Sequence, residues 1–156
     1  MSDISTLKEK INTKTFHLVL LGLLTGGLYL NIWMYKTFTA LEDVTRIKTM
    51  SSAFFVGYLA LIGIIGYVSV VPHLYALVLT GILLLVLIAL SLLWCFRVRR
   101  VLKAYALAVH NFELRMNLVY TGLFSFYYVN YCINALASDK QKHEDKMRAK
   151  HEAIQA

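Results

Sequence analysis

Charged residues, proline and cysteine are all scarce in this sequence. Charged residues make up 16% of the 156 residues, against ~25% in ordinary soluble domains, while hydrophobic residues make up 58%. This balance excludes a disordered chain, which has low hydrophobicity. The two cysteines, Cys95 and Cys132, form no C-x-x-C pair and no metal-ligand spacing, which excludes a disulfide scaffold. An integral membrane protein is the class that fits this composition.

Acidic and basic residues are absent from three long runs, residues 15–35, 49–96 and 116–138. A spanning helix needs about 20 apolar residues, so the central run is too long for one helix and about right for two. Pro72, near the middle of this run, lacks a backbone donor and suits a turn. We therefore predict two spanning helices, over residues 51–71 and 73–96, joined by a very short loop.

Recognisable catalytic motifs are also absent, because the sequence contains no G-x-S-x-G, no H-E-x-x-H and no P-loop. No Asp, Glu, Lys or Arg lies inside the apolar runs, which argues against an ion-coupled transporter. His17 and His110 form one candidate haem or metal pair, but interfacial histidines bonded to backbone or water are the interpretation that we favour. We predict no enzymatic activity, no cofactor and no metal.

The two ends of the chain repeat a short pattern. Gly27-Leu28-Tyr29 followed by Trp33 matches Gly122-Leu123-Phe124 followed by Tyr128, and residues 15–18 match residues 111–114. The shared core is a glycine with aromatic residues two and six positions later. Glycine bends or breaks membrane helices. We therefore predict an internal duplication in which Gly26, Gly27 and Gly122 break the outer apolar segments.

The first copy resembles a family signature. Residues 25–35 read TGGLYLNIWMY and resemble the T-x-G-[IL]-Y-x-x-x-W-x-Y pattern of a family of small bacterial membrane proteins, which is known only as a domain of unknown function and often carries the pattern twice. The residues that we assign to the signature and its helix breaks are Gly26, Gly27, Tyr29, Trp33 and Tyr35, then Gly122, Phe124 and Tyr128. Asn130 replaces the last tyrosine of the second copy. The resemblance implies a bacterial inner-membrane protein, and it brings no activity that could be carried over to this chain.

Positive charge predicts the topology. All sixteen Lys and Arg residues lie outside the Val71-Pro72-His73 loop, so the positive-inside rule places this loop outside and the basic segments in the cytoplasm. Full spans of the outer runs, giving a four-helix bundle, would put both termini outside and discard the charge bias. We therefore favour an all-α protein in which two re-entrant or interfacial segments flank the central hairpin.

The chain divides into a membrane domain, residues 1–138, and a charged cytoplasmic tail, residues 139–156. The tail reads as a solvated helix, with Lys140 and Glu144 spaced for an ion pair. The net charge of +7 is therefore attributed to cytoplasmic segments and not to nucleic-acid binding.

Two surfaces are candidates for binding. One is a basic patch that suits anionic lipid headgroups, made of Arg97, Arg99, Arg100 and Lys103. The other is a small-residue helix face, for which we favour packing within this chain over a dimer interface, made of Ala53, Gly57 and Ala60. We predict a non-catalytic inner-membrane accessory or scaffold protein that docks to another membrane protein or to itself and favours membrane curvature. The alternative is a binder or passive conduit for lipid or a small apolar solute.

Overall fold

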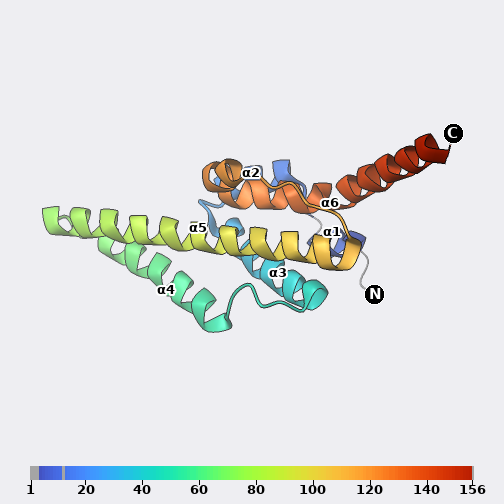
Figure 1. The fold of residues 1–156 in the computed structure, drawn as a ribbon. Coiled ribbons are helices and arrows are strands. Elements are labelled where there is room, and N and C mark those ends of the chain that lie inside the picture. Colours follow the sequence, from blue (N-terminus) through green and yellow to red (C-terminus); the bar gives the residue numbers. More distant parts are fainter. Residues whose placement is uncertain (1–3, 12, 156) are drawn as a thin grey trace.

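The structure, a computed structural model, describes residues 4–11 and 13–155. Within these residues the chain forms helices and no strand, in the order α1 (Ile4–Ile11), α2 (Thr15–Leu24), α3 (Leu28–Thr45), α4 (Ser52–Ser69), α5 (Leu74–His110) and α6 (Leu118–Gln155) (Figure 1). The predicted all-α class is confirmed.

Helices α4 and α5 come from the long central run and lie beside each other (Figure 1). The Ser51 hydroxyl accepts a hydrogen bond from the Phe54 N–H at 3.2 Å and caps α4. The turn between the helices contains Pro72, as expected. Helix α5 continues to His110, well beyond the predicted end at residue 96, because Arg, Lys and Ala in the following stretch are all good helix formers.

Both helices are long and apolar enough to cross a membrane. Only 6% of the most apolar window of each helix is buried within the chain, whereas the core helix of a soluble protein is mostly buried. A buried hydrogen bond of 2.9 Å between the Tyr58 and Ser91 hydroxyls links the pair. Their apolar side chains therefore face outward, as they do when lipid is the solvent.

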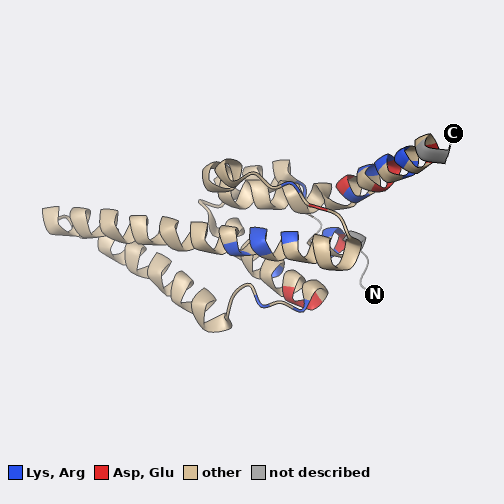
Figure 2. Ribbon diagram, in the orientation of Figure 1, with Lys and Arg blue, Asp and Glu red and all other residues tan. Residues whose placement is uncertain are grey.

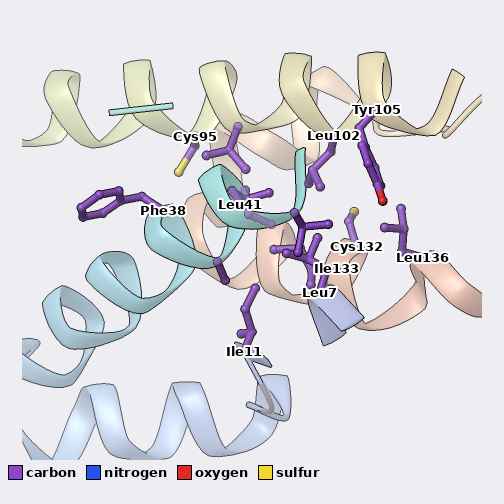
Figure 3. Close-up of a cluster of buried hydrophobic side chains, with 14 of the residues drawn as sticks. Leu7, Ile11, Phe38, Leu41, Cys95, Leu102, Tyr105, Cys132, Ile133 and Leu136 are labelled. Atoms are coloured by element: carbon purple, nitrogen blue, oxygen red, sulfur yellow. The ribbon is translucent and has the colours of Figure 1, made fainter. Parts of the chain in front are cut away.

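The hydrophobic core lies around the C-terminal half of α5. Helices α1, α2, α3 and α6 gather there, while the end of the hairpin near Pro72 projects alone (Figure 1). Figure 3 shows side chains from four helices meeting in this core, among them Leu7, Leu41, Leu102, Ile133 and Leu136. We call this packed part of the molecule the body.

An extended segment, residues 112–117, follows Asn111, whose backbone is left-handed with φ 55° and ψ 29°, and connects α5 to α6. Phe112, Leu114 and Met116 are buried, and the residues between them are exposed. Because side chains of extended backbone alternate between two faces, one face of this segment covers the body. The sequence match of residues 111–114 with residues 15–18 therefore does not extend to conformation, since residues 15–18 open helix α2.

The charged tail is continuous with α6 and extends away from the body (Figure 1). Lys140 and Glu144 form the predicted ion pair at 3.7 Å. Charged side chains lie on the body and the tail, and the projecting end of the hairpin carries no charge (Figure 2). The fold thus separates an apolar end from a charged end.

Candidate functional site

The first predicted break lies where the glycines are. Helix α2 ends at Leu24, and Gly26 and Gly27 adopt positive φ angles of 57° and 90° before α3 begins. The Thr25 hydroxyl donates to the Leu21 carbonyl at 2.6 Å and accepts from the Tyr29 N–H at 3.0 Å. One threonine side chain therefore satisfies backbone groups on both sides of the break.

The second break lies at Ser125 and not at Gly122. Helix α6 passes through Gly122, and the non-helical backbone occurs at Ser125, with φ 39° and ψ −112°. Glycine permits a break but does not force one. The residue after Ser125 is Phe126, whose ring packs against Trp33 and Trp94, so tertiary packing decides where this segment bends.

The aromatic residues of the signature differ in how deeply they are buried. Trp33 is buried, and its ring meets that of Trp94 edge-on, with centroids 6.1 Å apart. Tyr35 and Phe124 are exposed. The Tyr128 hydroxyl accepts a hydrogen bond of 2.9 Å from the Asn117 N–H at the start of α6. The signature therefore supplies both a core residue and surface aromatics.

Asn130, which replaces the last tyrosine of the second signature copy, is fully buried and joins three parts of the chain. Its side-chain carbonyl accepts from the Trp33 indole N–H at 3.0 Å. Its amide donates to the Thr13 carbonyl at 2.9 Å and to the Thr15 hydroxyl at 3.2 Å. Asn134 donates to the same Thr13 carbonyl at 2.9 Å.

Sequence reasoning did not assign a role to Asn130. The available signal was its departure from the signature, together with a second asparagine one helical turn later, at Asn134.

The predicted basic patch is divided by the structure. Arg99 donates from two guanidinium nitrogens to the Met116 carbonyl, at 3.1 and 3.0 Å, and so anchors the extended segment. Arg97 and Arg100 line a cavity, and Lys103 is not among the residues that line it. The four basic residues therefore have different surroundings in the fold.

This cavity has a volume of about 510 Å³ and lies between α5 and the chain entering α4. Its cationic residues are Lys48, Arg97 and Arg100, and its apolar residues include Phe54 and Leu93. We call it the α4–α5 cavity. Lys48 has an ion pair of 3.6 Å with Glu42 outside the cavity lining. No described carboxylate forms an ion pair with Arg97 or Arg100.

Two buried polar atoms that belong to residues lining the α4–α5 cavity have no hydrogen-bond partner among the described residues. They are the Thr49 hydroxyl and the Trp94 indole nitrogen, and both residues are only 2% exposed. Buried donors in proteins almost always have an acceptor. The cavity therefore combines cations, free donors and an apolar wall.

The predicted helix-packing residues Ala53, Gly57 and Ala60 are exposed. A Cβ added to Gly57 would meet no atom within 4 Å. Helix α4 packs instead through Tyr58, which is buried, and through the half-buried Phe54. The packing within this chain that we favoured from the sequence is therefore wrong, because the larger side chains of α4 fill the helix interface.

The histidines and cysteines have separate surroundings. His17 lines a shallow hollow with Tyr29, and His110 lies beside the ring of Tyr105. Among the residues that the structure describes, no three His, Cys, Asp or Glu side chains form a group that could hold a metal. Burial raises the pKa of the Cys132 thiol to about 11, so this thiol is protonated at neutral pH.

Comparison of the chain with protein-family models, with curated proteins and with solved structures finds no match.

Proposed function

We propose that this protein is a non-catalytic scaffold of a bacterial inner membrane that places its body in the cytoplasmic leaflet and favours curved membrane. The observation that carries the proposal is the uneven cross-section of the fold. One end consists of the α4–α5 hairpin alone, whereas the other end adds four further helices around α5 (Figure 1). A protein of this shape occupies more area in one leaflet than in the other.

Exposed apolar side chains support a body that is partly embedded in lipid. On α2, Phe16 is 73% exposed, and Leu23 and Leu24 are each 74% exposed. Others lie at the start of α3 and of α6, among them Leu28, Ile32, Leu118 and Leu123. Soluble monomers rarely expose apolar patches of this extent.

The breaks support re-entry of the outer segments. Helix α2 has 10 residues, or ~15 Å, which is half of a ~30 Å hydrocarbon core. The chain then turns at Gly26 and Gly27, and α3 leads to the charged residues Glu42 and Asp43. A straight spanning helix, as the four-helix alternative requires, is difficult to reconcile with this turn.

Membrane tubes pulled from giant vesicles test the curvature. We expect protein whose basic side faces outward to be at least about twofold denser on narrow tubes than on the flat vesicle, because the larger end then lies in the expanded leaflet. Leu23→Ser with Leu24→Ser makes the embedded surface polar and lowers this enrichment. The matched control is Leu74→Ser with Tyr75→Ser, two exposed residues at the other end of the hairpin. Equal density on tubes and flat membrane would contradict the proposal.

The scaffold role includes docking of another membrane helix on the face formed by Ala53, Gly57 and Ala60. This face is exposed, and the space around Gly57 is open. Small residues allow two membrane helices to approach closely. Gly57→Leu should abolish cross-linking of α4 to the docked membrane helix of the partner protein in native membranes. Gly66→Leu is the control, because Gly66 is equally open and lies on the opposite face of α4.

A lipid-binding function is the second candidate, and the α4–α5 cavity favours it.

A further inference from the structure

The α4–α5 cavity lies at the depth of the lipid headgroups if α5 crosses the membrane as proposed. The apolar part of α5, from Leu74 to Phe96, measures ~35 Å, which matches a ~30 Å hydrocarbon core. Leu93 and Trp94 belong to the last turn of this part, and Arg97 and Arg100 follow it directly. The cavity thus joins the hydrocarbon level to the charged level.

Its charge suits a phosphate group. Arg97 and Arg100 are three residues apart, so they lie on one side of α5, and Lys48 enters from the segment before α4. Guanidinium groups bind phosphate oxygens through two parallel hydrogen bonds. With no carboxylate paired to either arginine in the described chain, this charge is available to a ligand.

The two unpartnered donors point to the same ligand. The described chain has four buried side-chain atoms without a hydrogen-bond partner, and two of them, on Thr49 and Trp94, belong to residues of this cavity. An indole N–H can only donate, and a hydroxyl donates readily to an anion. Phosphate oxygens are acceptors, so a phosphate group in the cavity complements the cations directly. The two donor atoms are themselves buried, so the phosphate reaches them through a change of side-chain rotamer.

The apolar wall of the cavity favours a lipid over a free anion as the ligand. Phe54 and Leu93 line the cavity together with the cations, and Leu93 is 63% exposed. A free phosphate would use only the polar half of this surface. An anionic phospholipid would use both halves, with its acyl chains beside α5.

We infer that the α4–α5 cavity binds an anionic phospholipid, with the phosphate held by Arg97, Arg100 and Lys48 and by the donors of Thr49 and Trp94 once these buried side chains turn toward it. The inference rests on the proposed membrane placement and names the lipid class that this scaffold takes. It separates a specific site from the diffuse attraction that any basic patch exerts on a membrane.

Lipid titration of the full-length protein in a neutral detergent tests the site. The midpoint of thermal unfolding is measured against added phosphatidylglycerol, phosphatidylcholine or inorganic phosphate. We expect phosphatidylglycerol to raise the midpoint and the other two to leave it nearly unchanged. Arg97→Gln with Arg100→Gln should weaken the apparent affinity about tenfold or more.

Lys36→Gln with Lys103→Gln is the matched control, because it removes the same charge from positions that do not line the cavity. Its affinity should change by less than about threefold. Thr49→Val removes one free hydroxyl without changing charge and should weaken binding about tenfold while the protein remains folded, since this hydroxyl bonds nothing in the described chain.

Three results would overturn the inference: equal losses in the two double variants, an equal response to phosphatidylcholine, or an equal response to inorganic phosphate. The last would identify a free-anion site. Because micelles have no leaflet asymmetry, a failure here leaves the curvature proposal standing, and a failure on membrane tubes leaves lipid binding standing.

Discussion

The indole N–H of Trp33 donates to the side-chain carbonyl of Asn130 across 3.0 Å, in a site from which solvent is excluded. These residues are 97 positions apart and belong to the two outer apolar segments. Asn130 also donates to Thr13 and Thr15, so it joins the start of α2, the middle of α3 and α6. A buried polar network of this kind fixes one arrangement of helices, because every alternative leaves donors unpaired.

Asn130→Leu should therefore destabilise the body strongly. The substitution keeps the branching of the side chain but leaves the buried Trp33 indole N–H without an acceptor, at a cost of about 1–3 kcal/mol. The Thr13 carbonyl keeps its bond from Asn134. Thermal unfolding in detergent measures it. Asn31→Leu is the control, because Asn31 makes only a local hydrogen bond of 3.3 Å to Gly27. A similar loss in both variants would show that Asn130 has no special role.

The two signature glycines should respond differently to alanine. At Gly27, φ is 90°, so Gly27→Ala is strained and should cost about 1–3 kcal/mol even though no atom lies within 4 Å of the new Cβ. Gly122 is helical, and a Cβ there meets only Phe96, at 3.9 Å. Gly122→Ala should be neutral or stabilising. Unfolding curves of both variants under the same conditions decide this, and the reverse order would place the break at Gly122 after all.

Arg99 should control the mobility of residues 112–117. Its two bonds to the Met116 carbonyl hold the C-terminal end of this segment on α5, so Arg99→Gln should speed amide hydrogen exchange near Met116. Arg99→Lys keeps the charge but not the paired geometry, and should give an intermediate effect. Unchanged exchange in Arg99→Gln would mean that the buried side chains of Phe112 and Leu114 hold the segment by themselves.

Cysteine labelling should distinguish the topology with re-entrant outer segments from the topology in which these segments span the membrane. Cys95 and Cys132 are buried and the pKa of Cys132 is raised to about 11, so the wild-type protein should react slowly with an impermeant maleimide at neutral pH. Raising the pH toward this pKa should speed the labelling of Cys132, because only the thiolate form reacts with the maleimide.

In intact cells, His73→Cys should be labelled from outside, whereas Lys142→Cys should be labelled only after the membrane is opened. Labelling of Lys142→Cys in intact cells would favour full spans of the outer segments.

Several features follow from short-range properties of the sequence. The helices α4 and α5, the turn at Pro72 and the break at Gly26 and Gly27 occur where they were predicted, apart from the longer α5. Hydrophobic length, the missing proline donor and the steric freedom of glycine act locally, so they can be read from neighbouring residues. The same reasoning placed the Lys140–Glu144 pair correctly.

The second break and the binding surfaces required the tertiary structure. Helix α6 bends at Ser125 because Phe126 packs against both Trp33 and Trp94, and these aromatic residues come from three separate helices. The division of the basic patch has the same origin, since only the fold brings Met116 to Arg99 and Thr49 to the cavity beside Arg97.

What the sequence by itself determined is the all-helical class and the two apolar helices, because these depend on spacing and composition along the chain. Only the tertiary structure decided that Asn130 is a buried junction, that the small residues of α4 face outward, and that two of the arginines share a cavity with unpaired donors. The physical reason is that hydrogen-bond satisfaction and packing join residues far apart in the chain, and no local pattern records which partners will meet.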